Sequence, residues 1–181
     1  MKIENQDKFS ENINLEADYL VEEQKIISLN KFIFLSIITF GLYDVWWIYK
    51  AWDFFDQKEK LDINPAIRTL FSIFFLISLF NRILRFAKEK GYNNNYNSIL
   101  LFIGFWVANF LTYLPEPFCL ISIFGYVFLV LPFKALNFAK RNSTDFIVTE
   151  QTSFSSRQIA LIIIGVTLWV FILLGSTIVD V

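Results

Sequence analysis

The residues whose types and spacing could carry chemistry are concentrated in one stretch, from Thr39 to Trp52. Three of the five tryptophans and two of the seven tyrosines lie there, together with Asp44. Tryptophan and tyrosine side chains gather where an apolar phase meets hydrated lipid headgroups. An alternative is a groove for lipid or another hydrophobic ligand, in which Gly41 allows a bend or a close helix approach. The residues of the predicted interfacial aromatic belt are Tyr43, Trp46, Trp47, Tyr49 and Trp52.

Asp44 stands out in this stretch, because a carboxylate at membrane depth is costly and marks a candidate functional site. Its candidate partners are Arg68 and Arg82, which flank the next hydrophobic segment, and Lys50 near the expected interface. Asp44, Arg68 and Arg82 therefore form a candidate intramembrane polar site. The alternative is that Asp44 reaches the headgroup region and only caps a helix or pairs locally.

Other kinds of chemistry find little support in the residue types. The chain has no histidine, which excludes histidine acid–base catalysis and histidine metal sites, and its single Cys119 cannot form an intramolecular disulfide. We find no phosphate-cradling glycine loop, paired carboxylates or metal-ligand cluster in the sequence. The net charge of −1 does not favour nucleic acid. We expect no catalytic residue, no metal, no cofactor and no enzymatic activity.

The composition points to a membrane protein. Of the 181 residues, 55% are hydrophobic and only 18% are charged, and 22 are phenylalanine. An average soluble domain carries about 25% charged residues. We predict an all-α integral membrane helical bundle over residues 31–181, preceded by a polar, partly disordered cytoplasmic tail over residues 1–30. The five hydrophobic segments of the bundle are expected at about 32–49, 66–85, 98–114, 118–134 and 158–179.

The last three segments are the clearest membrane spans. Residues 159–179 carry no charge and, as a helix, would extend roughly 30 Å, the thickness of a bilayer core. Residues 115–117, with two prolines, predict a tight turn between two antiparallel helices, and Pro132 predicts a kink or an end. Gly104 and Ala108 form a small-residue pair that allows close helix packing.

The first two segments either span or re-enter. Residues 32–49 are nearly long enough to cross but contain Gly41 and Asp44, and residues 69–81 form a short uncharged run. Asn64 and Pro65 predict the start of a helix, and Lys90-Gly91 predicts the end of one. The length of the first segment favours five crossings, whereas the charge distribution slightly favours the model in which neither segment crosses.

The lysine and arginine residues set the expected orientation. They lie in the N-terminal region, in 50–68, in 82–90 and in 134–157, and none lies in the turn at 115–117 or after Arg157. Positive residues mark the cytoplasmic side. We therefore expect a multi-pass membrane protein with a cytoplasmic N-terminus and an external C-terminus.

The aromatic stretch resembles that of a family of small bacterial multi-pass inner-membrane proteins of unknown function. The residues that carry the resemblance run from Thr39 through Gly41 and Tyr43 to Trp46-Trp47 and Tyr49, with Asn64-Pro65 and Pro132 further along. The resemblance would cover most of the chain, about residues 18–178. It implies a bacterial inner-membrane location and no particular catalytic residue.

Three classes of function remain open. We favour a structural or accessory membrane protein that contacts lipids, another copy of itself or helices of a partner membrane protein. The first alternative is a subunit of a small transporter or channel that uses Asp44 with Arg68 or Arg82. The second is a lipid-modifying membrane enzyme, which would need acidic, basic and nucleophilic residues at one depth.

Overall fold

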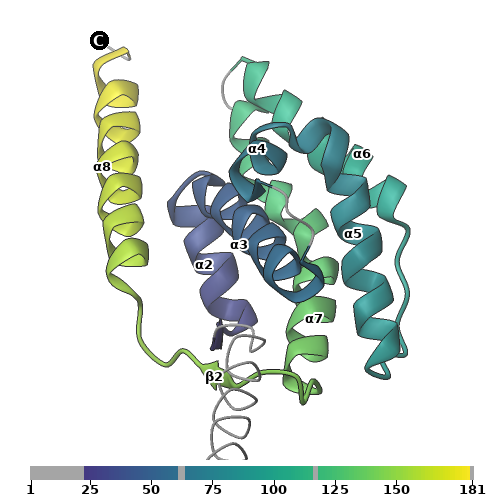
Figure 1. Cartoon of the computed structure of the whole chain (residues 1–181). Helices are drawn as coiled ribbons and strands as arrows, with labels where there is room; N and C mark the ends of the chain where they lie inside the picture. The colour runs from purple at the N-terminus through teal and green to yellow at the C-terminus, as the bar shows by residue number, and fades with distance from the viewer. Residues whose placement is uncertain (1–22, 61–63, 116–117, 180–181) are drawn as a thin grey trace, which may run out of the picture.

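The computed structural model describes residues 23–60, 64–115 and 118–179, and these residues are mostly helical (Figure 1). The tail expected over residues 1–30 falls largely outside them. Within the described part of the chain there are seven α-helices, two 3₁₀ stretches and two short strands. The elements are β1 (Gln24–Ile26), α2 (Leu29–Ile38), α3 (Leu42–Glu59), α4 (Pro65–Leu70), α5 (Ser72–Glu89), α6 (Ser98–Phe110), η1 (Leu111–Tyr113), η2 (Phe118–Tyr126), α7 (Val127–Arg141), β2 (Val148–Glu150) and α8 (Ser156–Val179).

The hydrophobic core lies between α2, α3, α5 and α7. Trp52 and Phe55 of α3, Phe80 of α5 and Phe32 of α2 are fully buried. The ring of Phe32 stacks on that of Phe133 from α7, with ring centres 4.3 Å apart. Large aromatic side chains contribute much of the energy of such cores, because each buries a large apolar area. The core is thus built around helix α3.

The first hydrophobic segment is divided by a sharp reversal between α2 and α3. Gly41 N donates to Ser36 O at 2.9 Å and Phe40 N donates to Ile37 O at 3.3 Å, the bonding pattern of a Schellman C-cap. Phe40 and Gly41 both adopt left-handed backbone angles, with φ of 51° and 81°. In Figure 1, α2 climbs and α3 descends from this point. Residues 32–49 therefore do not form one continuous helix, because the chain reverses direction between α2 and α3.

The second segment is also divided, with a break at Phe71 between α4 and α5. Asn64 caps α4 as expected, because its Oδ1 accepts hydrogen bonds from Ala66 N at 3.0 Å and Ile67 N at 3.2 Å. Helix α5 ends as expected at Glu89, with Lys90 as its C-cap. Gly91 follows with φ of 91°, a left-handed value that glycine adopts without steric cost.

Helix α6 and the η2–α7 stretch form an antiparallel pair, and Pro115 begins the connection between them (Figure 1). Residues 116 and 117 of that expected turn lie outside the described residues. Pro132 does not end the helix: α7 continues for nine residues beyond it to Arg141. Pro132 lies in the sixth position of α7, where neighbouring helices bury it, so packing compensates for the backbone bond that proline removes.

Two helical stretches are long and apolar enough to cross a membrane by length and composition: Leu120–Arg141, with 22 residues, and Ser156–Leu174, with 19. The third expected span, over residues 98–114, is a shorter apolar helix followed by the 3₁₀ turn η1. Helix α8 lies beside the bundle and contacts mainly α2 (Figure 1). The candidate spans are thus η2–α7, partly inside the bundle, and α8, at its side.

The two strands were not expected from the sequence. β1 pairs with β2 in parallel, with Gln24 opposite Val148 and Ile26 opposite Glu150. Strands of three residues are too short for an alternating pattern to identify them. Their pairing ties the N-terminal segment to the loop before α8, and Asn137 of α7 adds a hydrogen bond to Ile27 O at 3.0 Å.

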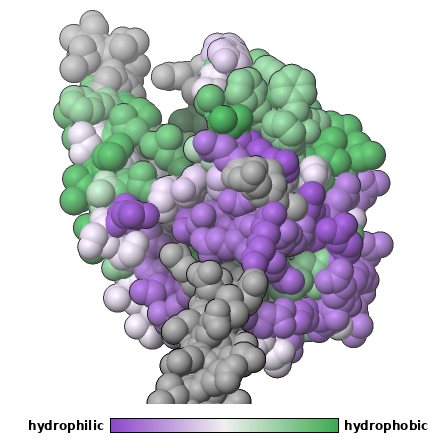
Figure 2. All heavy atoms as spheres, viewed as in Figure 1, coloured by the Kyte–Doolittle hydropathy of each residue, from purple (hydrophilic) through white to green (hydrophobic). Residues whose placement is uncertain are grey.

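Charged and apolar surfaces are separated in the structure. In Figure 2, hydrophilic atoms cover the centre and lower part of the face shown, and hydrophobic atoms cover its upper part and the helix at the left, α8. At the charged end, the Nζ atoms of Lys90, the C-cap of α5, and of Lys58 in α3 lie 3.3 and 3.9 Å from Asp145 Oδ2. A hydrogen bond from Ser143 and these two lysines hold the pKa of Asp145 below its usual value. The ends of α3 and α5 are thereby joined to the loop after α7.

Candidate functional site

The predicted aromatic belt is divided between the core and the surface. Tyr43, Trp47 and Trp52 are 4%, 7% and 0% exposed, so they pack inside the protein. Trp46 and Tyr49 are partly exposed, and their rings stack with centres 5.4 Å apart. The physical reason is that the reversal at Gly41 folds this face of α3 onto α2 and α7. The part of the belt that is exposed on the outer surface is therefore limited to Trp46 and Tyr49.

Asp44 lies in the first turn of α3 and is buried, with 4% exposure. Its Oδ1 accepts a hydrogen bond from Ser36 Oγ, on the last turn of α2, at 2.5 Å. A carboxylate near a helix N-terminus is favoured by the helix dipole, and a buried carboxyl needs a donor. Asp44 therefore joins α3 to α2 beside the reversal.

Arg68 and Arg82 do not join Asp44. The guanidinium of Arg68 lies over the ring of Trp52 at 4.6 Å and over that of Phe75 at 5.2 Å. Arg82 pairs with Glu59 at the end of α3, and Arg85 adds a second ion pair to Glu59 at 3.5 Å. The structure thus places Asp44, Arg68 and Arg82 in three separate contacts.

The three small residues proposed for helix packing play different parts. A Cβ atom added to Gly104 would lie 2.1 Å from Cε1 of Phe128, so the ring of Phe128 from α7 packs directly against the backbone of α6 at this position. Ala108 is buried on the same face, near Gly125. Gly41, in contrast, serves the reversal through its left-handed backbone.

The foot of α8 is held by a polar cluster that sequence reasoning missed. Ser155 N donates to Gln158 Oε1 at 2.9 Å, and Gln158 N donates to Ser155 Oγ at 3.3 Å, which is a capping box. Gln158 Nε2 also donates to the hydroxyl of Tyr43 at 3.2 Å, and Gln151 Nε2 donates to Gln158 Oε1 at 2.7 Å. The spacing Ser155-x-x-Gln158 before an apolar run was the signal that could have identified it.

A cavity of about 750 Å³ opens beside this cluster, between β1, α3, α7 and the first turn of α8. Tyr43, Trp46 and Trp47 form part of its apolar wall. Lys140 and Arg157 belong to its polar wall, together with Gln158. Lys140 is 8% exposed, and its position near the end of a hydrophobic segment had suggested only a loop charge. This cavity, called the foot cavity below, is the best-formed candidate site in the described residues.

The lining of the foot cavity is suited to binding a ligand. Among the described residues, no group of three or more histidine, cysteine, aspartate or glutamate side chains is arranged to hold a metal ion. The cavity combines ammonium and guanidinium groups with amides and aromatic rings. Such a lining suits an anion attached to an apolar body.

Comparison with known proteins gives one match. Residues 27–114 match the family described as Domain of unknown function (DUF4234). This range contains the aromatic stretch and runs from the start of α2 to just beyond α6, whereas α7 and α8 lie outside it. The comparisons with curated proteins and with solved structures each found no match. The family description assigns no activity, so function has to be argued from the site and the surface.

Proposed function

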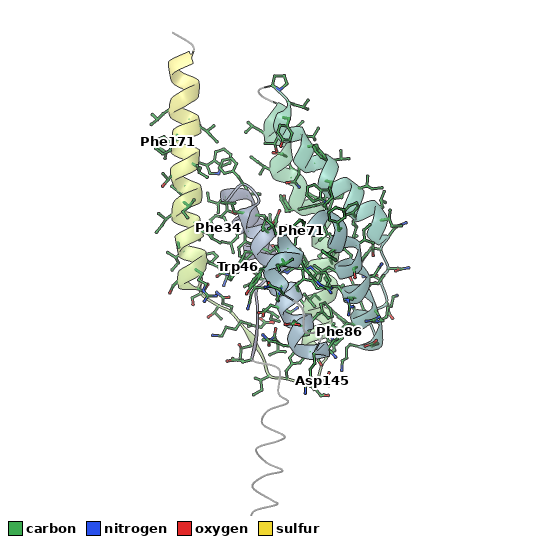
Figure 3. The ribbon with its side chains drawn as sticks, turned by 45° about the horizontal axis from the view of Figure 1, so that its top comes forward. Phe34, Trp46, Phe71, Phe86, Asp145 and Phe171 are labelled. Atoms are coloured by element: carbon green, nitrogen blue, oxygen red, sulfur yellow. The ribbon has the colours of Figure 1, made fainter. Side chains whose placement is uncertain are left out.

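We propose that the protein is an accessory integral membrane protein, without enzymatic activity, that acts through contacts of its apolar helices with lipid or with helices of a membrane partner. The observation that carries the proposal is the outer surface of α8. Ile163, Phe171 and Leu173 on this helix are 61%, 67% and 60% exposed. Figure 3 shows Phe171 on the outer side of α8, far from Asp145 at the charged end. Water would make such a surface costly, and lipid or another apolar helix would not.

A second apolar surface supports the same proposal. Helix α6 exposes large side chains along its length, among them Leu100 at 66%, Val107 at 54% and Phe110 at 60%. Contiguous apolar patches of this kind mark interaction surfaces in proteins. The partner in this proposal is membrane lipid, a second copy of the chain or another membrane protein.

The orientation we propose is the one that the basic residues favour. The charged end, with Lys58, Lys90 and Asp145, would face the cytoplasm of a bacterium, and α8 would carry the C-terminus to the outside of the inner membrane. Under this arrangement α2 and α3 enter and leave on the cytoplasmic side. The membrane-embedded surface would then be that of α6, η2, the apolar part of α7 and α8.

The geometry gives less support to transport through Asp44. Transport through Asp44 would need a polar path that reaches Asp44 together with Arg68 or Arg82. The foot cavity is lined by Tyr43 and Trp47 but by none of those three residues. We therefore keep the accessory role as the proposal.

Site-specific photo-crosslinking tests the proposed role. A photoreactive amino acid at Phe171, on the exposed surface of α8, is expected to yield adducts with lipid or a membrane protein in native membranes. The same probe at Leu76, which is fully buried, should yield only intramolecular adducts. Recovery of the chain in the water-soluble fraction, with no external adduct at Phe171, would overturn the proposal.

A further inference from the structure

The wall of the foot cavity contains a buried lysine with no carboxylate partner among the described residues. Lys140 is 8% exposed, its Nζ donates to Gln24 Oε1 at 2.9 Å, and the same Nζ lies over the ring of Phe54 at 4.2 Å. The ion pairs of the described residues do not include Lys140. A buried ammonium is costly unless an anion compensates it. The amide, the ring and the longer-range attraction of Asp53, which Lys50 opposes, compensate this charge only in part.

The cavity as a whole has an excess of positive charge. Its lining contains four basic and two acidic residues, and Lys50 already pairs with Asp53 at 2.6 Å. Arg157 also lines the cavity, with its guanidinium over the ring of Trp46 at 5.6 Å. No described carboxylate pairs with Arg157 either. Lys140 and Arg157 therefore leave two cationic groups in the wall of one cavity.

The position of the cavity matches the level of lipid headgroups if the proposed function holds. Arg157 is the last charged residue before the uncharged run of α8, and the first turn of α8 forms part of the cavity wall. In a spanning helix, such an arginine marks the boundary between the hydrocarbon core and the headgroups. Trp46 and Tyr49, the two partly exposed members of the aromatic stretch, lie close by on α3.

We propose that the foot cavity binds the phosphate-bearing headgroup of an anionic phospholipid from the cytoplasmic leaflet, with Lys140 and Arg157 contacting the phosphate. The apolar wall formed by Tyr43, Trp46 and Trp47 accommodates the glycerol and the first part of the acyl chains. The volume of about 750 Å³ is within the range of small-ligand sites, roughly 300–1,000 Å³. Bound lipid would supply the anion that the described residues do not supply to Lys140.

Native mass spectrometry of the detergent-purified chain tests this inference. The probes are phosphatidylglycerol, which is anionic, and phosphatidylcholine, which is zwitterionic. We expect one phosphatidylglycerol molecule to bind at least about tenfold more tightly than phosphatidylcholine. Lys140→Met and Arg157→Gln should each weaken phosphatidylglycerol binding, the former by about tenfold, because a charge-assisted hydrogen bond to a buried cation is lost.

Arg141→Gln is the matched control. Arg141 follows Lys140 directly, but it is exposed, pairs with Glu150 at 2.9 Å and does not line the cavity. This variant should bind phosphatidylglycerol as the original chain does. Arg157 is also exposed, so Arg157→Gln tests the site even if Lys140→Met reduces folding.

Two results would overturn the inference. One is equal binding of phosphatidylglycerol by the original chain and by both cavity variants. The other is displacement of bound phosphatidylglycerol by millimolar inorganic phosphate, which would make this a site for a soluble anion. If the chain integrates into membranes but shows either result, only the lipid site is contradicted. If the chain does not integrate into membranes, the proposed function itself is contradicted.

Discussion

Asp44 and Ser36 form a buried pair at the reversal of the chain, where α2 ends and α3 begins. Both side chains are almost completely buried, and the carboxyl of Asp44 accepts a hydrogen bond from the hydroxyl of Ser36. The pair connects two helices in a region for which the aromatic stretch alone indicates a single hydrophobic segment. Its first role in this structure is therefore to hold the reversal between α2 and α3.

We predict that Ser36→Ala destabilises the protein by about 1–3 kcal/mol, because it leaves a buried carboxyl without its donor. Asp44→Ala should have a similar effect, and the double variant should lose less than the sum of the two. Denaturant unfolding in detergent measures all three. Ser153→Ala, at an exposed position, serves as the control and should have no effect. Additive effects of the two substitutions would contradict the pairing.

The variant Asp44→Asn distinguishes a structural role of Asp44 from a role in transport. Asparagine keeps the shape of the side chain and can accept a hydrogen bond from Ser36, so the variant should fold and locate as the original chain does. In the accessory role its cellular phenotype should be unchanged. Loss of a proton or cation flux in proteoliposomes containing Asp44→Asn, with intact folding, would instead support the transport alternative.

At the scale of elements, α8 meets the bundle at two small contacts near the reversal. A Cβ atom on Gly165 would lie 2.1 Å from the carbonyl oxygen of Ile38, so the two backbones touch. Next to this contact, the rings of Phe40 and Trp169 lie with centres 4.6 Å apart. Phe40 occupies a left-handed backbone position where glycine is usual, and its ring contact with α8 helps to offset that strain.

We predict that Gly165→Val separates α8 from α2, since the larger side chain has no space against the Ile38 carbonyl. Cysteines introduced at positions 40 and 169, in a Cys119→Ser background, provide the readout with a short bismaleimide. Cross-linking should be efficient with Gly165 and should fall several-fold with Gly165→Val. Ala160→Val adds the same kind of bulk at an exposed position of α8 and should leave the yield unchanged. Equal yields in both variants would show that the contact does not position α8.

The polar cluster at the foot of α8 makes a separate prediction. Gln158→Ala removes the capping box and the hydrogen bond to Tyr43, a loss of about 1–2 kcal/mol from the first turn. Hydrogen exchange over residues 151–160 should therefore become faster, while exchange in α5 should not change. Thr167→Val, further along the same helix, should leave the first turn protected. Unchanged hydrogen exchange in Gln158→Ala would show that this cluster does not attach α8 to the rest of the protein.

How far each element could be predicted depended on whether its cause is local. The cap at Asn64, the stop at Gly91 and the long apolar helix α8 follow from neighbouring residues, and the sequence indicated them. The β1–β2 pairing depends on contact between distant segments. The reversal at Phe40 is made by local hydrogen bonds, but it places a phenylalanine in a left-handed position where glycine is usual, so the residue type does not indicate it. Trp52 illustrates the limit of prediction from sequence. Its side chain is equally suited to lipid and to a protein core, and only the fold places it in the core.

The candidate site was predictable only in part for the same reason. Tyr43, Trp46 and Trp47 were singled out from their spacing, and they do line a cavity. Lys140 lies about ninety residues further along the chain, and nothing local indicates that it is buried. The partners proposed for Asp44 were the basic residues at the ends of the next segment, but the break at Phe71 and the ion pair with Glu59 take those residues elsewhere.

At the scale of the whole molecule, we propose that the charged end faces the cytoplasm and that α8 crosses the membrane away from it. The structure separates the charged end around Asp145 from the apolar surfaces of α6 and α8 (Figures 2 and 3). The positive-inside rule then gives the direction. The loop around Asn94, between α5 and α6, and the C-terminal Val181 should lie on opposite sides of the membrane.

Cysteine accessibility in intact cells tests this claim most directly. Asn94→Cys and Val181→Cys, each in a Cys119→Ser background, are treated with a membrane-impermeant maleimide before and after permeabilisation. We predict labelling of Val181→Cys in intact cells and labelling of Asn94→Cys only after the membrane is opened. Labelling of Asn94→Cys in intact cells, or protection of Val181→Cys until permeabilisation, would contradict the orientation.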